Sequence, residues 1–139
     1  MTTARDIMKP GAQWISKDDT VERAARVMAE LGVGSLVVAD EHQRMCGIIT
    51  DRDIVVKCLA RNCDPAGTLA AQLCESTPRW VDADADIDEV LDEMESHRVK
   101  RMPVIEDKRL VGMISEADLA RHLDDHQLSE FVTAIYGRP

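Results

Sequence analysis

Aromatic residues are scarce in this chain: tryptophan, tyrosine and phenylalanine together make up 3% of its 139 residues. A hydrophobic fraction of 45% is nevertheless enough for a packed core, which excludes an intrinsically disordered chain. The core must therefore consist mainly of valine, isoleucine, leucine, methionine and alanine. The length is that of one ordinary domain.

Positive charge is also in short supply. The formal net charge is −9 at pH 7, and the sequence pI is about 4.8. Nucleic-acid backbones and anionic membrane surfaces both attract a surplus of lysine and arginine. We therefore expect neither a nucleic acid nor a membrane as a partner.

Long apolar runs are missing as well. No stretch approaches the 18 or so apolar residues that span a bilayer, and residues 1–6 contain no apolar segment of the kind found in a secretory leader. These absences predict a cytoplasmic protein.

No C-x-x-C pair occurs among the four cysteines, Cys46, Cys58, Cys63 and Cys74. In a reducing cytoplasm the default expectation is free, mostly structural thiols. Cys58 and Cys63 are close enough in sequence to form a disulfide if the loop between them allows it, so the state of this pair stays open.

The chain does contain an internal repeat. Residues 47–53 (GIITDRD) and 112–118 (GMISEAD) lie 65 residues apart, and each copy indicates an apolar strand that feeds the start of a helix. Thr50 and Ser115 stand at the N-cap positions, and the acidic residues behind them suit the positive end of the helix dipole. Helix capping alone would explain either copy, but the repetition favours a function.

Hydrophobic periodicity extends the repeat over most of the chain. It predicts amphipathic helices over residues 20–31, 51–60 and 86–97, and strand pairs that precede the two motifs. The first helix should end at Gly32, the second should bury Val55 and Leu59, and the second strand of the first pair should cover residues 45–50. The predicted fold is α/β (α+β), with two tandem β-α-β-β-α repeats and a C-terminal helix. The expected domains are a first repeat with an N-terminal helix at 1–62, a linker at 63–69, a second repeat at 70–123, and a C-terminal helix and tail at 124–139.

Four segments together carry a family resemblance. Each repeat ends in G-h-h-[ST]-x-x-[DE]-h, where h is apolar, while VKRMPV at 99–104 precedes the second hairpin and GVGSLVV at 32–38 occupies the equivalent place in the first. These segments resemble a tandem pair of cystathionine-β-synthase (CBS) domains over about residues 5–123. The whole chain is similar to the stand-alone CBS pairs of the mycobacterial hypoxic response protein family.

The resemblance implies a pseudo-two-fold pair of repeats that acts as a regulatory module. Such a module binds an adenine nucleotide (AMP, ADP, ATP or a related adenosyl ligand) in the cleft between the repeats, and an unidentified partner protein reads its conformational change. It also implies a homodimer that pairs helices 20–31 and 86–97 with their mates. The alternative is a ligand-free dimeric structural or interaction protein of a stress response.

Signatures of catalysis are missing from the sequence. The chain has no P-loop, no G-x-G-x-x-G fingerprint after a strand and no serine–histidine or cysteine–histidine arrangement with a recognisable elbow. We therefore expect a protein that is not an enzyme and that requires no cofactor.

Two carboxylates and two hydroxyls suit a nucleoside. Asp53 and Asp118, at the starts of their helices, can each accept hydrogen bonds from both hydroxyls of a ribose. Thr50 and Ser115, which precede them by three residues, can donate to the sugar or the α-phosphate at the helix N-terminus. We expect all four residues to bind the ligand.

The phosphates and the base need different surroundings. Lys100 and Arg101 are the best-placed cations for phosphates, and a twisted sheet can provide the apolar slot that a base needs. The expected lining residues are Ile15, Val37, Ile48, Val81, Val104 and Met113, and the resemblance adds Pro103.

The two repeats differ at the cation positions. The first repeat has Gly34 and Ser35 where the second has Lys100 and Arg101, and it also lacks the following proline. We therefore expect two sites that are not equivalent.

A metal site is a weaker interpretation of the histidines. His122 and His126 have i, i+4 spacing, but no third ligand stands at motif spacing, so an ordinary surface or helix-end role is expected and no metal is predicted.

Overall fold

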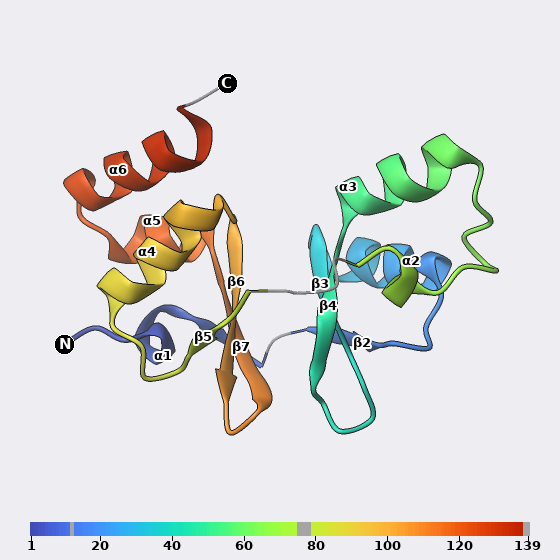
Figure 1. Ribbon diagram of the computed structural model, residues 1–139, viewed down its shortest axis with the longest axis horizontal. Coiled ribbons are helices and arrows are strands. Elements are labelled where there is room, and N and C mark those ends of the chain that lie inside the picture. Colours follow the sequence, from blue (N-terminus) through green and yellow to red (C-terminus); the bar gives the residue numbers. More distant parts are fainter. Residues whose placement is uncertain (12, 75–78, 138–139) are drawn as a thin grey trace. The chain divides into compact units, whose positions relative to one another are not determined.

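The computed structural model describes residues 1–11, 13–74 and 79–137 (Figure 1). The chain forms two compact units, Met1–Ala12 with Arg79–Pro139 and Gln13–Pro78. We call them the second-repeat unit and the first-repeat unit, after the repeat that each contains. Each has its own sheet and its own helices, so the predicted mixed α+β architecture is confirmed.

The second-repeat unit contains a four-stranded sheet with the order β1-β7-β6-β5. Its central hairpin, β6 and β7, is antiparallel, and β5 lies parallel to β6. The strands are β1 (Lys9–Pro10), β5 (Val81–Asp82), β6 (Arg101–Glu106) and β7 (Arg109–Ser115). The helices are α1 (Ala4–Ile7), α4 (Ile87–His97), α5 (Glu116–His122) and α6 (Asp125–Tyr136).

The N-terminal helix α1 is part of this second-repeat unit. Ala4 and Ile7 are 0% and 1% exposed in its hydrophobic core, and the amide of Ala4 donates to the carbonyl of Ala85 at 2.8 Å. Arg5 adds ion pairs with Asp84 and Glu106. The segment at the start of the chain therefore completes the core of the repeat that lies further from it in sequence.

The first-repeat unit contains a three-stranded sheet with the order β2-β3-β4. Helix α2 begins after its N-cap Thr20 and ends at Gly32, which has a left-handed φ of 66°, as the sequence predicted. The strands are β2 (Trp14–Ser16), β3 (Ser35–Ala39) and β4 (Met45–Thr50). The helical segments are α2 (Val21–Leu31), α3 (Asp51–Asp53), η1 (Ile54–Cys58), η2 (Leu59–Arg61) and η3 (Ala70–Gln72).

The segment after the first repeat folds back onto that repeat. Ala70 and Leu73 are 0% and 7% exposed in the core of the first-repeat unit. The amide of Ala70 donates to the carbonyl of Asp19 at 2.8 Å, and the amide of Val21 donates to that of Thr68 at 2.9 Å. The domain boundaries expected from the sequence stay a prediction about the repeats, since the second-repeat unit combines two separate stretches of the chain.

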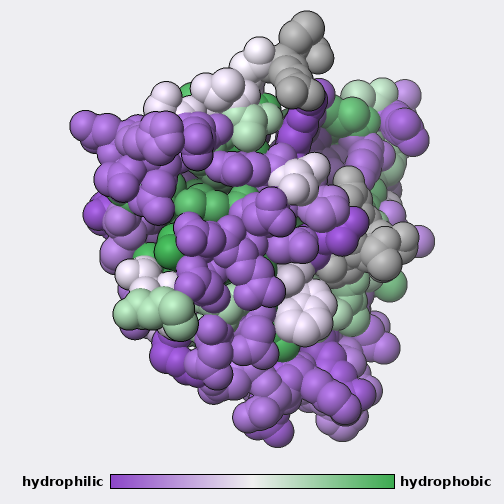
Figure 2. Space-filling model, turned by 60° about the vertical axis from the view of Figure 1, so that its left-hand side comes forward, coloured by the Kyte–Doolittle hydropathy of each residue, from purple (hydrophilic) through white to green (hydrophobic). Residues whose placement is uncertain are grey.

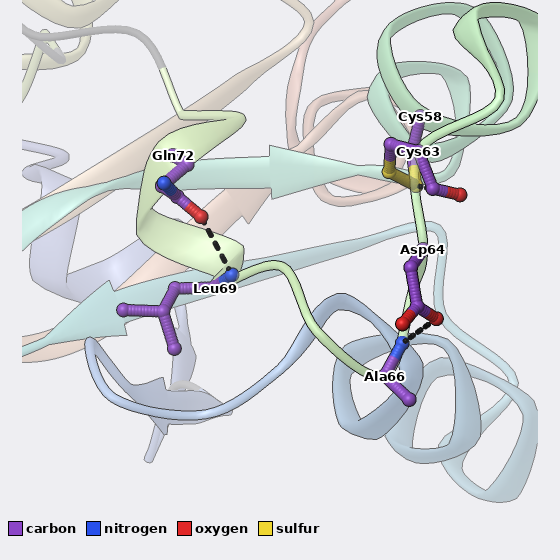
Figure 3. Close-up of a disulfide and its surroundings, with 6 residues drawn as sticks. All are labelled: Cys58, Cys63, Asp64, Ala66, Leu69 and Gln72. Atoms are coloured by element: carbon purple, nitrogen blue, oxygen red, sulfur yellow. Dashed lines mark hydrogen bonds between the residues drawn. A yellow bond between two sulfur atoms is a disulfide. The ribbon is translucent and has the colours of Figure 1, made fainter.

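Cys58 and Cys63, the pair whose state the sequence left open, form a disulfide (Figure 3). Asn62, with a left-handed φ of 57°, reverses the chain and brings the two Cα atoms to 4.7 Å. Beyond the bond, Asp64 accepts from the amide of Ala66 in a tight turn. Cys46 and Cys74 are free.

The helical run after β4 departs from regular α-helix. It begins as α3, continues as the π-helix η1 and ends as the 3₁₀ turn η2. Ile54 and Cys58 are buried, whereas Val55 and Leu59, which helical spacing would place on the buried side, are 55% and 54% exposed. Of these four residues, the π-helical run therefore buries only Ile54 and Cys58 in the core.

Most side chains on the face drawn in Figure 2 are hydrophilic, in keeping with the charge content of the chain. Within the described ranges, no helix has both the length and the apolar character needed to cross a membrane.

Candidate functional site

Asp118 and Ser115 form a closed hydrogen-bonded pair at the start of α5. Oδ2 of Asp118 accepts from the amide and from Oγ of Ser115, both at 2.9 Å, and the amide of Asp118 donates back to Oγ at 3.4 Å. Oδ1 contacts the guanidinium of Arg121. Asp118 is 4% exposed, and these contacts hold its carboxylate in one position.

Asp53 and Thr50 repeat this arrangement at the start of α3. The amide of Thr50 donates to Oδ2 of Asp53 at 2.9 Å, and the amide of Asp53 donates to Oγ1 of Thr50 at 3.1 Å. Nζ of Lys57 lies 3.1 Å from Oδ1 and also donates to the carbonyl of Leu73 at 3.1 Å. Both motifs therefore cap helices, which was the simpler interpretation, and each leaves one carboxylate oxygen to a cation.

The predicted cations lie beside the pair that Ser115 and Asp118 form. The antiparallel register of β6 and β7 places Arg101 opposite Ser115, the last residue of β7 and the N-cap of α5. Lys100 precedes Arg101, and both side chains are exposed. In the first-repeat unit the equivalent partner of Thr50 is Ser35, so no cation stands at that place.

The predicted apolar lining divides between the two faces of each sheet. Val37 pairs with Ile48, and Pro103 pairs with Met113. None of these four belongs to a helix-covered core cluster. Three other predicted lining residues, Ile15, Val81 and Val104, do pack in those clusters.

A groove of about 670 Å³ runs between α4 and α6. Glu95 and Arg98 line one side, and His126 and Glu130, whose Nε2 and Oε1 atoms lie 3.2 Å apart, line the other. Burial, followed by the charge of Glu130, raises the pKa of Glu95. No predicted ligand residue lines this groove.

His122 and His126 do not share a helix, because α5 ends at His122 and α6 begins at Asp125. Nδ1 of His122 lies 2.9 Å from the carbonyl of Asp118. Among the residues that the structure describes, no three histidine, cysteine, aspartate or glutamate side chains gather in a way that could hold a metal ion.

Sequence reasoning missed four residues that touch the site. Lys57 and Arg121 stand at i+4 and i+3 from the carboxylates, a spacing that favours helical ion pairs and was a usable signal. Tyr136 and Glu116 are joined by hydrogen bonds of 2.8 and 3.0 Å. The sequence carries no signal for this second pair, because α6 must first fold back against α4.

Known proteins share the sequence patterns of both repeats. The family model for the CBS domain matches residues 4–59 and 70–125. Hypoxic response protein 1 of Mycobacterium tuberculosis is 46% identical over 135 residues, which cover 97% of this chain and 94% of that protein.

Solved structures share the fold. The crystal structure of Hypoxic Response Protein I with two coordinated zinc ions has a TM-score of 0.81 and 46% identity, covering 88% of this chain and 100% of that chain. The CBS domain pair of protein MJ0100, in complex with 5′-methylthioadenosine and S-adenosyl-L-methionine, has a TM-score of 0.77 and 25% identity, covering 87% and 94%.

Proposed function

This chain belongs to the CBS domain family, and we propose that it binds an adenine nucleotide at the hydroxyl–carboxylate pairs of its repeats. Tandem CBS domains are generally non-catalytic regulatory modules, and a name such as hypoxic response protein fits a role in stress. In this proposal the nucleotide shifts the conformation of the module, and a partner protein reads the change. Such a shift requires that the ligand bind one conformation more tightly than the other.

The register between β6 and β7 is the observation that carries the proposal. It places Arg101 opposite Ser115, so a cation pair stands next to the N-terminus of α5 and the carboxylate of Asp118. Phosphate groups favour cationic side chains and helix N-termini, whereas ribose hydroxyls favour a carboxylate. The second repeat thus offers both chemistries on adjacent residues.

The carboxylate oxygens can exchange partners when a ribose arrives. Oδ1 of Asp118 is held by Arg121, whose side chain is 59% exposed, and Oδ1 of Asp53 by Lys57, whose side chain is 37% exposed. Exposed ion pairs contribute only about 0 to 1 kcal/mol, whereas a buried carboxylate needs a partner. A diol can therefore replace Lys57 at little cost, and at Asp118 it must itself take over the contact of Arg121 with Oδ1, while the capping bonds to Oδ2 stay in place in both repeats.

The adenosyl part of the proposed ligand has support from a relative of the same fold. The CBS pair of MJ0100 is in complex with 5′-methylthioadenosine and S-adenosyl-L-methionine, which share adenine and ribose. Lys100 and Arg101 are the reason to propose a phosphate-bearing ligand for this chain. Pairs Pro103–Met113 and Val37–Ile48 are our candidates for contact with the base.

Thermal unfolding with a ligand panel tests the proposal. Adenosine, AMP, ADP, ATP and S-adenosyl-L-methionine are compared with GMP at matched concentrations. A ligand at 100 times its dissociation constant should stabilise the protein by about 2.7 kcal/mol. If no adenosyl compound shifts the midpoint, the proposed function is wrong.

Paired arginine variants assign the phosphate position. Arg101→Gln removes one cation beside Ser115, while Arg109→Gln makes the same change at the far end of the hairpin, where Arg109 pairs with Glu106. We expect Arg101→Gln alone to weaken AMP binding by about tenfold or more, and to leave adenosine binding unchanged. Equal affinities in the two variants would show that the phosphate lies elsewhere.

Carboxamide variants assign the ribose. Asp118→Asn should weaken adenosine and AMP alike, and Asp53→Asn should affect a phosphate ligand less, because its repeat lacks the cation pair. Circular dichroism checks that each capped helix still folds.

A specific observation also supports the second candidate function, a dimeric interaction protein. Val55 and Leu59 are 55% and 54% exposed on one helical run, and Leu31 at the end of α2 is 44% exposed. The large apolar residues of α4, by contrast, are buried in its own unit. We propose that these exposed residues contribute to a homodimer, and light scattering should show loss of the dimer in Val55→Lys.

A further inference from the structure

The ring of Tyr136 lies over the ammonium group of Lys100. Nζ of Lys100 is 4.7 Å from the ring centroid, and the phenol hydroxyl donates to Oε1 and Oε2 of Glu116 at 2.8 and 3.0 Å. One side chain therefore contacts the cation that precedes β6 and the carboxylate that begins α5. Tyr136 is the sole tyrosine of the chain.

Helix α6 positions the ring of Tyr136. Tyr136 is the last residue of α6, which packs beside α4 (Figure 1). Phe131 of the same helix is 1% exposed in the core of the second-repeat unit, and Ile135 packs against that core. At the start of α6, Asp124 and Gln127 form a reciprocal capping box. Both ends of the helix are thus fixed, and the tyrosine contact is part of the packed unit.

The two residues that Tyr136 contacts are neighbours of the proposed phosphate site. Lys100 precedes Arg101, Glu116 follows Ser115, and Arg101 and Ser115 lie opposite each other on β6 and β7. The Tyr136 side chain therefore contacts the same end of the β6–β7 hairpin as the one where Lys100 and Arg101 lie.

The first repeat has no counterpart of this contact. Gly34 occupies the place of Lys100, and its carbonyl accepts from the amide of Asp51 at 2.9 Å. No second tyrosine exists in the sequence to cover this end of the hairpin. The contact therefore distinguishes the repeat that has the cations from the repeat that lacks them.

We propose that Tyr136 is a latch that withholds Lys100 from phosphate and that opens when phosphate binds. The inference rests on the proposed function for its natural ligand. With the latch closed, the ammonium of Lys100 contacts the ring of Tyr136, and the hydroxyl of the same tyrosine binds the carboxylate of Glu116. A phosphate must draw Lys100 off the ring and faces repulsion from Glu116, so phosphate binding and latch closure oppose each other.

This competition connects the ligand to the C-terminal helix. Coupling between two events is reciprocal, so a phosphate that opens the latch frees the last turn of α6 to the same extent that the closed latch weakens phosphate binding. The expected size is modest, because an exposed cation–π contact corresponds to about a two- to fivefold change in affinity.

Calorimetry on matched variants tests the affinity part. Tyr136→Leu removes ring and hydroxyl, Tyr136→Phe keeps the ring over Lys100, and Val132→Ala truncates another exposed residue of α6 as the control. We expect Tyr136→Leu to bind ATP about two- to fivefold more tightly than wild type. Tyr136→Phe should fall between the two, Val132→Ala should match wild type, and adenosine affinity should stay constant throughout.

Lysine acetylation provides a readout without any ligand. N-hydroxysuccinimide acetate modifies free amines, and mass spectrometry compares Lys100 with Lys108, an exposed lysine in the β6–β7 turn of the same unit. We expect the ratio of Lys100 to Lys108 modification to rise in Tyr136→Leu. ATP should lower Lys100 modification in both proteins.

Inorganic tripolyphosphate separates the failure of this inference from the failure of the proposed function. If ATP and adenosine bind no variant, but tripolyphosphate binds Tyr136→Leu more tightly than wild type, the latch is supported and the proposed nucleotide function is wrong. If phosphate compounds bind Tyr136→Leu equally well or more weakly, or if Lys100 modification does not change, the latch is wrong.

Discussion

The carboxylates of Asp53 and Asp118 serve the local fold before any ligand is considered. Each accepts a bond from the N-cap amide through Oδ2, and each has a cation on Oδ1. Of these contacts, only the cation contact can be exchanged without uncapping the helix. The sequence pattern predicted the capping role, because a hydroxyl followed by an acid three residues later is typical of a capping box. It could not predict that Asp118 would be the more buried of the two.

Gly112 is required by the close approach of β1 to β7. A Cβ atom at this position would lie 2.9 Å from the carbonyl oxygen of Lys9 and would also meet the side chain of Met8. We predict that Gly112→Ala lowers the free energy of unfolding by about 1 to 3 kcal/mol. Urea denaturation followed by circular dichroism measures the change.

The double variant Met8→Ala with Gly112→Ala identifies the cause. The flexible methionine can give way, but the backbone carbonyl cannot. Truncating Met8 should therefore recover only part of the loss, and full recovery would contradict the argument from β1.

Cys74 should react slowly with alkylating agents in the folded protein. Burial, followed by the nearby charge of Asp53, raises the pKa of its thiol from 9.0 to about 11. At pH 8 about one molecule in a thousand then holds the thiolate that reacts with iodoacetamide. We predict a rate that rises about tenfold per pH unit from pH 8 to 10, measured by mass spectrometry with Cys46 as the exposed reference.

The same pKa shift sets the sign of a stability effect. The folded state holds the Cys74 proton more tightly than the unfolded state does, so this group contributes stability below pH 9. That contribution is lost as the pH rises towards about 11. A Cys74→Ala variant should lose this part of the alkaline destabilisation.

At the scale of elements, the strands and most helices followed from local patterns. The predicted strand Met45–Thr50 has the same bounds in the structure, and Gly32 ends α2 as expected. The run from Asp51 to Arg61 was harder, because an apolar pattern cannot distinguish a regular helix from one that widens into a π-turn. Its exposed Val55 and Leu59 and its disulfide both lie in this irregular part.

The disulfide fastens the end of this run to the segment that follows it. Cys58 is 0% exposed and lies in the core of the first-repeat unit, and Cys63 packs against the same core. We predict that reduction, or Cys63→Ser, lowers the free energy of unfolding by about 2 kcal/mol, as expected for a closed loop of about six residues. Thermal unfolding with and without a dithiol reductant measures it.

Comparison of the wild-type protein with Cys63→Ser shows whether the reductant acts through the Cys58–Cys63 disulfide. A reductant should destabilise wild type and leave Cys63→Ser unchanged, while Cys74→Ala should still respond like wild type. Equal responses of wild type and Cys63→Ser would show that the reductant acts elsewhere.

At the scale of the whole molecule, the core of each unit includes a segment that lies outside its central repeat in the sequence. Residues near the start of the chain supply Ala4 and Ile7 to the core that contains the second repeat. The segment after the first repeat returns Ala70 and Leu73 to the core of that repeat. Sequence repeats reveal duplication but not this exchange, since the matched segments are alike and either assignment satisfies the pattern.

The exchange predicts which unit responds to a change near the N-terminus. Ile7 is 1% exposed, so Ile7→Ala should cost about 2 to 5 kcal/mol. The loss should fall on the second-repeat unit, although Ile7 stands beside the first repeat in sequence. The two tryptophans make this measurable, because Trp80 lies in the second-repeat unit and Trp14 in the first.

Single-tryptophan proteins give separate unfolding curves. In Trp14→Phe the fluorescence reports on Trp80, and in Trp80→Phe it reports on Trp14; both side chains are partly exposed, so either replacement should be mild. Ile7→Ala should shift the Trp80 curve to lower urea by more than it shifts the Trp14 curve. Leu73→Ala, whose side chain packs in the first-repeat unit, should show the opposite order. If Ile7→Ala moves the Trp14 curve more, the N-terminal helix serves the first repeat, and the exchange of segments between the units is wrong.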